Sequence, residues 1–112
     1  SQVVCMKISI PKPFPAPAEF FVRRAGYGKI TDRARGETSY VYRLSRTAFY
    51  PRLHLYIESE DATSISLNLH LDQKQPSYEG SHMHSGEYEG ELVEKEAARI
   101  KEAVAKAMPS SE

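Results

Sequence analysis

Apolar and polar residues alternate along four segments of the chain, as they do in strands that bury one face. These segments are residues 3–10, 39–46, 50–59 and 63–72. The last segment shows the pattern most clearly, because four odd-numbered apolar residues point to one side: Ile65, Leu67, Leu69 and Leu71. The alternation predicts strands that turn one side to a core and the other to solvent.

Segments 50–59 and 63–72 are joined by three residues, a length that suits a hairpin. Two registers fit the turn, because the apolar residues of both strands have odd numbers. In one register His54 faces Asn68, and in the other it faces His70. Either register places His54, Tyr56, Asn68 and His70 on the polar side of the sheet.

A repeat of three to four residues replaces the alternation in 91–108, where it predicts an amphipathic helix. The apolar stripe of this helix consists of Val93, Ala97, Ile100, Val104 and Ala107. A shorter helix is predicted in 18–28, with Gly26 as the left-handed residue that ends it.

The remaining segments lack a sustained period. Residues 11–17 contain four prolines and predict an extended connector, either a stiff crossover or a ligand for another domain. Residues 29–38 predict a loop with room for a short strand at its start. Residues 73–90 predict a long loop, and residues 109–112 a tail.

The order β-α-β-β-β-α predicts an α+β fold, a two-layer sandwich. Its mainly antiparallel sheet has about four strands, and both helices lie on one face. The 112 residues suit a single domain, 1–112, with a strand and connector in 1–17 and an α-β-β-β-α unit in 18–108. The single cysteine and the lack of a long apolar run favour a cytoplasmic protein without a membrane partner.

The net charge of zero conceals an asymmetry between the two halves of the chain. Residues 1–57 carry ten Lys and Arg against three Asp and Glu, and residues 58–112 carry five against twelve. Three interpretations stay open: a basic surface for a polyanion, pairing of the halves within the fold, or pairing between subunits of a homodimer.

The basic half interleaves arginines with aromatic residues, a combination that binds phosphates and stacks on unpaired bases. If Tyr40 and Tyr42 pack inward, Arg43 joins His54, Tyr56 and His70 on the open sheet face. The leading hypothesis is therefore a protein that binds single-stranded or structured RNA. Its candidate residues are Arg23, Arg24, Arg33, Arg35, Arg43, Arg52 and Tyr56.

A second hypothesis concerns the histidines of the long loop. His82 and His84 point the same way in an extended segment, and with His70 and Glu87 they would form a site for a divalent transition metal. A third hypothesis is nucleophilic catalysis, for which residues of the right type are His70, Asp72, Ser81, His84 and Ser85. A nucleophile elbow and a glycine-rich phosphate loop are both lacking, which disfavours an enzyme.

The predicted order α-β-β-β-α from residue 18 onward resembles the double-stranded-RNA-binding domain in topology. That family has a basic cluster at the start of its last helix, where this chain has Glu91, Glu94 and Glu96. The resemblance therefore implies the fold and an RNA partner, but a different way of contacting phosphates. The stretches FVRRAGYGKITDRARGE and HLDQKQPSYEG also resemble small bacterial proteins of unknown function, and this resemblance implies no activity.

Overall fold

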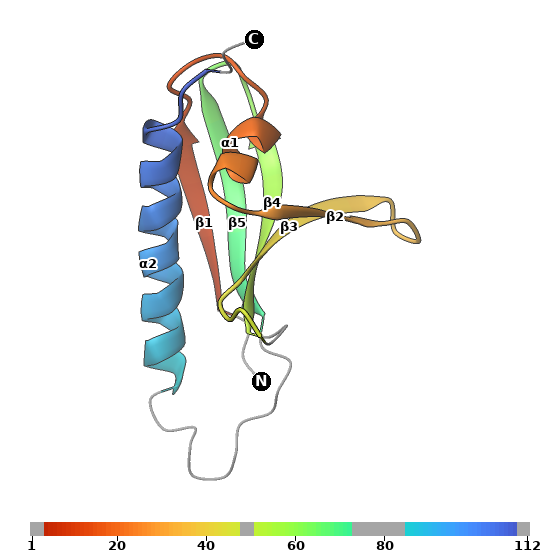
Figure 1. Ribbon diagram of the computed structural model, residues 1–112, viewed down its shortest axis with the longest axis vertical. Helices are drawn as coiled ribbons and strands as arrows, with labels where there is room; N and C mark the ends of the chain where they lie inside the picture. Colours follow the sequence, from red (N-terminus) through yellow and green to blue (C-terminus); the bar gives the residue numbers. More distant parts are fainter. Residues whose placement is uncertain (1–3, 48–50, 73–84, 110–112) are drawn as a thin grey trace.

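The computed structural model describes residues 4–47, 51–72 and 85–109, with the backbone alone for Val4 and residues 85–89. Its two helices are α1 (Ala18–Arg24) and α2 (Ser85–Ala105) (Figure 1). Its strands are β1 (Val4–Pro11), β2 (Gly28–Asp32), β3 (Glu37–Arg43), β4 (Arg52–Glu60) and β5 (Ser64–Asp72). In the part of the chain described, neither helix is long and apolar enough to cross a membrane.

The strands form one antiparallel sheet in the order β1-β5-β4-β3-β2. The predicted α+β fold is confirmed, with five strands instead of about four. The N-terminal strand β1 pairs with β5, so β5 and β4 occupy the middle of the sheet and β1 and β2 its edges. The β2–β3 hairpin extends beyond the helices as an arm (Figure 1).

The β4–β5 hairpin adopts the second of the two predicted registers, in which His54 is the partner of His70. The same register holds from Arg52 to Ile57. It shifts by one residue between Ile57 and Ser59, where a bulge interrupts the ladder. The predicted polar face is therefore formed along the part of the hairpin that lies before the bulge.

Both helices pack on the opposite, apolar face of the sheet, as predicted. The strands contribute buried Leu53, Leu55 and the odd-numbered residues of β5 to this core. The helix α2 contributes its predicted stripe, of which Val93, Ala97, Ile100 and Val104 are buried. It runs alongside β1, while α1 lies against β4 (Figure 1).

The strand β2 covers the start of the predicted loop 29–38, where room for a short strand was predicted. Four of its five residues are exposed, because it is an edge strand in the protruding arm. Burial therefore imposes no alternation on its sequence. The next strand, β3, runs from Glu37 to Arg43 instead of the predicted 39–46.

Both helices differ from the prediction in their ends. The helix α1 ends at Arg24 with Ala25 as its C-cap, and the left-handed residue Gly26 (φ 99°) follows. The helix α2 begins at Ser85, six residues before the predicted start at Glu91. Gly86 and Gly90 lie in these extra turns, and glycine lowers helix propensity, so the sequence pattern resembles a loop.

A buried polar network joins α2 to the segment between α1 and β2. The Tyr27 hydroxyl donates to Glu96 Oε2 at 2.6 Å. Arg99 donates through Nε and Nη2 to the same carboxylate, each at 2.8 Å, and Nη2 also donates to the Ala25 carbonyl at 2.8 Å. The guanidinium of Arg99 lies over the Tyr42 ring, 4.5 Å from its centroid. These contacts hold the first residues of the arm against α2.

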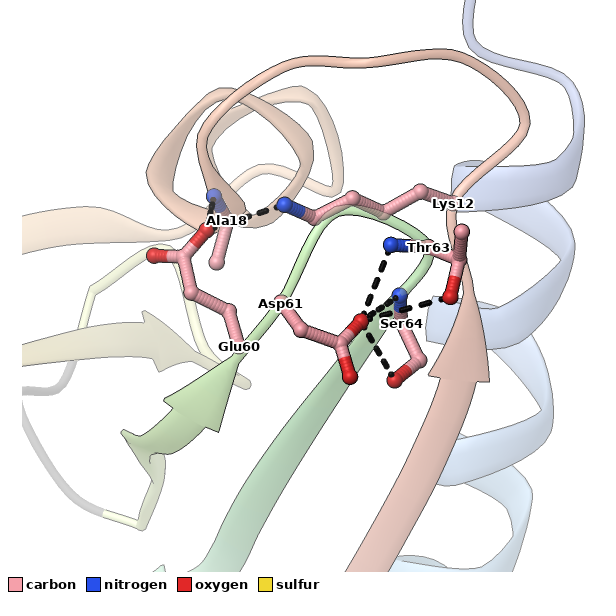
Figure 2. Close-up of polar contacts among 6 residues, drawn as sticks. All are labelled: Lys12, Ala18, Glu60, Asp61, Thr63 and Ser64. Carbon is pink, nitrogen blue, oxygen red and sulfur yellow. Dashed lines mark hydrogen bonds and ion pairs between the residues drawn. The ribbon is translucent and has the colours of Figure 1, made fainter.

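Two acidic residues at the end of the β4–β5 hairpin organise the elements around it (Figure 2). Glu60 Oε1 accepts hydrogen bonds from the Ala18 amide at 2.9 Å and from Lys12 Nζ at 3.0 Å. It thereby caps α1, whose N-cap residue Pro17 makes no side-chain cap. Asp61 Oδ1 accepts from the amides of Thr63 and Ser64, which closes the turn.

Candidate nucleic-acid interface on the open sheet face

The face of the sheet opposite the helices carries the polar side of β1, β4 and β5. Successive side chains of a strand alternate between faces, so the partners across the sheet form rows. One row runs from Cys5 through His70 and His54 to Val41. Within the described residues no helix covers this face, which we call the open face (Figure 1).

Three rings lie side by side at the centre of the open face. The ring centroids of His54 and Tyr56 are 4.8 Å apart, those of Tyr56 and His70 are 5.3 Å apart, and those of His54 and His70 are 6.3 Å apart. All three residues are half-buried. We call His54, Tyr56 and His70 the ring platform. Because the two central strands hold it, the platform is rigidly positioned.

Polar neighbours orient the His54 ring. Its Nε2 lies 2.8 Å from Ser39 Oγ, and its Nδ1 lies 3.8 Å from Asp72 Oδ2. Burial lowers the pKa of His54, and this effect outweighs the opposite influence of the Asp72 carboxylate. Arg52 and His70 lower the pKa further. The imidazole is therefore held in its neutral form, which favours stacking and hydrogen bonding over charge.

Ser39, His54 and Asp72 are the residue types of a hydrolase triad, but their geometry does not match one. The 3.8 Å between His54 and Asp72 is longer than a hydrogen bond. Ser39 is only 7% exposed, so its hydroxyl is poorly placed to attack a substrate. These contacts fix the ring and do not present a nucleophile. In the set predicted for catalysis, Ser81 and His84 lie outside the described residues, as does the side chain of Ser85.

The residues predicted to bind nucleic acid separate into three groups. Arg43, Arg52 and Tyr56 come together on the open face, because Tyr40 and Tyr42 pack towards the core as the hypothesis required. Arg23 and Arg24 occupy the last turn of α1, where Arg24 lies 4.6 Å from the centroid of the Phe20 ring. Arg33 and Arg35 lie in the turn at the end of the arm.

Two cations of the open face, Arg52 and Lys7, have acidic neighbours. Arg52 Nε donates to Asp72 Oδ2 at 3.2 Å. Lys7, on the edge strand β1, has its Nζ 3.9 Å from Glu58 Oε1, and its side chain is 78% exposed. Arg43 is exposed at the end of β3 and is the register partner of Arg52. Lys7 and Arg43 therefore flank the ring platform on opposite sides.

The predicted metal site is represented by one residue with a described side chain. His70 Nδ1 lies 3.5 Å from Cys5 Sγ. His82, His84 and the side chain of Glu87 lie outside the described residues. Where side chains are described, no group of three His, Cys, Asp or Glu residues could hold a metal ion. Transition-metal binding stays a prediction.

Sequence reasoning missed Ser39, Cys5 and Lys7 as members of the face. The alternation placed Cys5 and Lys7 on the polar side of their strand, but nothing in it pairs that strand with β5. Ser39 was the first residue of a predicted strand, and its contact with His54 depends on the register between β3 and β4. The sequence pattern does not indicate which strands, distant in the sequence, lie next to each other in the sheet.

Comparison of the chain with protein-family models gave no match, and comparison with curated proteins and with solved structures gave none either.

Proposed function

We propose that this protein binds single-stranded nucleic acid, with RNA as the first candidate, on the open face. The observation that carries the proposal is the ring platform, with its ring centroids 4.8 to 6.3 Å apart on an open sheet face. Unpaired bases stack on such rings with little regard to sequence. A duplex offers no free base faces, so a single strand is the better fit.

The charges near the platform support the same ligand. Lys7 and Arg43 lie on opposite sides of the rings, and both are exposed. Arginine and lysine side chains in this position neutralise backbone phosphates. The neutral form of His54 avoids an additional buried cation, so the centre of the face is suited to bases and its margins to phosphates.

Binding of a fluorescent ten-nucleotide RNA, measured by anisotropy at low and moderate salt, tests the proposal. Tyr56→Ala should weaken binding about tenfold, since stacking contributes about 1–3 kcal/mol per base. Tyr56→Phe keeps the ring and is the matched control, with affinity close to that of the wild type. No binding of the strand at low salt, or equal binding by Tyr56→Ala, would overturn the proposal.

Cys5 provides a second readout that does not depend on a variant. It is the single cysteine of the chain, it is exposed, and it is the register partner of His70. A bound strand should slow the reaction of Cys5 with a thiol reagent, in proportion to occupancy. A rate unchanged at saturating RNA would place the ligand elsewhere on the protein. Duplex RNA of the same length is the control and should protect Cys5 less.

A further inference from the structure

A hollow lies at the β2–β3 edge of the sheet, where the chain leaves α1 and enters the arm. Its volume is about 470 Å³. Its lining includes Gly28, Ile30, Val41, Lys29, Arg43 and Arg46. We call it the edge hollow.

Glycine creates the space at this point. A Cβ atom at Gly28 would have the Val41 carbonyl oxygen, 4.0 Å away, as its nearest neighbour, so the position is open. Gly26, by contrast, has a positive φ of 99°, and a Cβ there would lie 3.2 Å from the Tyr42 ring. Gly26 is thus required by the backbone path, while Gly28 leaves room that a side chain would occupy.

The charged residues that line the edge hollow are all cations, although Lys29 and Arg43 also have interaction partners of their own. Three of its lining residues are cations, Lys29, Arg43 and Arg46, and no carboxylate is among the lining residues described. Lys29 Nζ lies 3.1 Å from Glu19 Oε1 outside the hollow, but both side chains are about two-fifths exposed and water screens the pair. The hollow therefore favours an anion, and its apolar residues Ile30 and Val41 suit a sugar or a base.

The edge hollow continues the open face. Val41 lines the hollow and is also the register partner of His54, a member of the ring platform. From β4 to β2 the distance is two strand spacings, about 10 Å. A single ligand with rings and regularly spaced phosphates could therefore contact both places.

We propose that the edge hollow binds backbone phosphates of the same strand whose bases stack on the ring platform. The strand then crosses the sheet at a steep angle to the β-strands, from β5 and β4 towards β2. This inference rests on the proposed function and adds to it the path of the ligand and a minimum length. A single nucleoside should occupy the platform alone, while a strand of ten nucleotides should fill both places.

Two variants test the edge hollow without touching the platform. Arg46→Ala removes one exposed cation, and Gly28→Leu fills the space with no change in charge. Both should weaken binding of a ten-nucleotide RNA about three- to tenfold and leave the binding of a single nucleoside unchanged. Arg46→Ala should also reduce the salt dependence of log K by about 0.7, the value for one phosphate of a single strand. Lys101→Ala, an exposed charge change on α2, is the matched control and should bind as the wild type does.

Each result has a defined meaning. One outcome is that Arg46→Ala and Gly28→Leu bind the ten-nucleotide strand as tightly as the wild type, while Tyr56→Ala binds it more weakly. In that case the phosphate site proposed in the edge hollow is wrong, and the base site proposed on the ring platform is retained. If Tyr56→Ala is also unaffected, the proposed function itself fails. An equal loss for the nucleoside would indicate that the variants disturb the platform itself, and would overturn a distinct subsite. If millimolar inorganic phosphate or a mononucleotide displaces the ten-nucleotide strand, the edge hollow is a site for small anions and not part of a path for a strand.

Discussion

At the scale of single residues, the contacts of Glu96 are the most consequential buried polar interactions in the described structure. The carboxylate is 7% exposed and serves Tyr27 and Arg99 together. Burial raises the pKa of the Tyr27 hydroxyl above its ordinary range, and the Glu96 charge adds to this. The hydroxyl therefore stays protonated and donates throughout the accessible pH range.

Substitution of Tyr27 and substitution of Glu96 should lower the free energy of unfolding by different amounts. Tyr27→Phe removes one hydrogen bond and should lower the free energy of unfolding by about 1–2 kcal/mol. Glu96→Ala leaves the buried Tyr27 hydroxyl and the Arg99 guanidinium without their acceptor, and should cost about 3 kcal/mol. Urea denaturation measures both. Glu102→Ala, an exposed glutamate paired with Lys106, is the control and should show no measurable loss.

The lowered pKa of His54 predicts how stability depends on pH. The unfolded state takes up the proton near pH 6.5, while folded His54 takes it up at lower pH. Stability is therefore lost as the pH falls below about 6.5, until the folded pKa is reached. His54→Gln should flatten this part of the curve, measured by urea denaturation between pH 7.5 and 5. Equal slopes for the variant and the wild type would contradict the assignment, as would an NMR titration midpoint at or above 6.5.

At the scale of elements, the end of the β4–β5 hairpin determines how α1 begins. The Glu60 carboxylate accepts the Ala18 amide and lies against Lys12, whose side chain is only 6% exposed. These two donors keep the pKa of Glu60 below its ordinary value. A strand residue thus supplies the cap that the proline-rich connector, with Pro17 at the N-cap, does not provide.

Glu60→Ala should lower the free energy of unfolding by about 1–3 kcal/mol, because α1 loses its cap and the little-exposed Lys12 ammonium loses its acceptor. Glu60→Gln keeps an acceptor without the charge and should lie between the wild type and the alanine variant. Hydrogen exchange of the Ala18 amide should accelerate in the same order. An unchanged Ala18 exchange rate in Glu60→Ala would show that the cap does not stabilise α1.

Elements with one buried face were predictable from the sequence, and elements without one were not. The alternation in β5 predicted the strand, its buried side and two registers, of which His54 opposite His70 is confirmed. The arm strand β2 was predicted only as room for a short strand at the start of a loop, because exposure on both sides removes the pattern. On the open face, the polar side of β4 and β5 was predicted, whereas Cys5 and Lys7 depend on the pairing of β1 with β5. No local pattern records that pairing.

At the scale of the whole molecule, ion pairs within the fold partly compensate the charge asymmetry between the two halves of the chain. Three ion pairs join a cation of residues 1–57 to a carboxylate of residues 58–112: Lys7 with Glu58, Lys12 with Glu60, and Arg52 with Asp72. The arginines at the tip of the arm, Arg33 and Arg35, have no carboxylate within 4 Å among the described residues. The two halves of the chain therefore pair with each other at these three contacts. The arginines at the tip of the arm do not take part in this pairing.

The position of each strand in the sheet predicts a gradient of local stability. The strand β5 has a neighbour on both sides and four buried leucine or isoleucine residues, whereas β2 has one neighbour and mostly exposed side chains. Native-state hydrogen exchange should find the backbone amides of β5 exchanging only with global unfolding. The amides of β2 should open several kcal/mol more readily. Comparable protection of the β5 and β2 amides from hydrogen exchange would contradict this gradient.

The pairing of β1 with β5 also bears on the order in which the chain folds. The register partners from Val4 with Leu71 to Pro11 with Ser64 are separated by most of the chain. During synthesis, the N-terminal strand has no place in the sheet until residues 64–72 have left the ribosome. Ile8 and Ile10, which are buried in the native core, stay exposed until then. Such non-local pairing slows folding, because the loop must close before any contact is gained. We therefore expect the β3–β4–β5 meander, whose pairings are local, to form first and β1 to dock on it later.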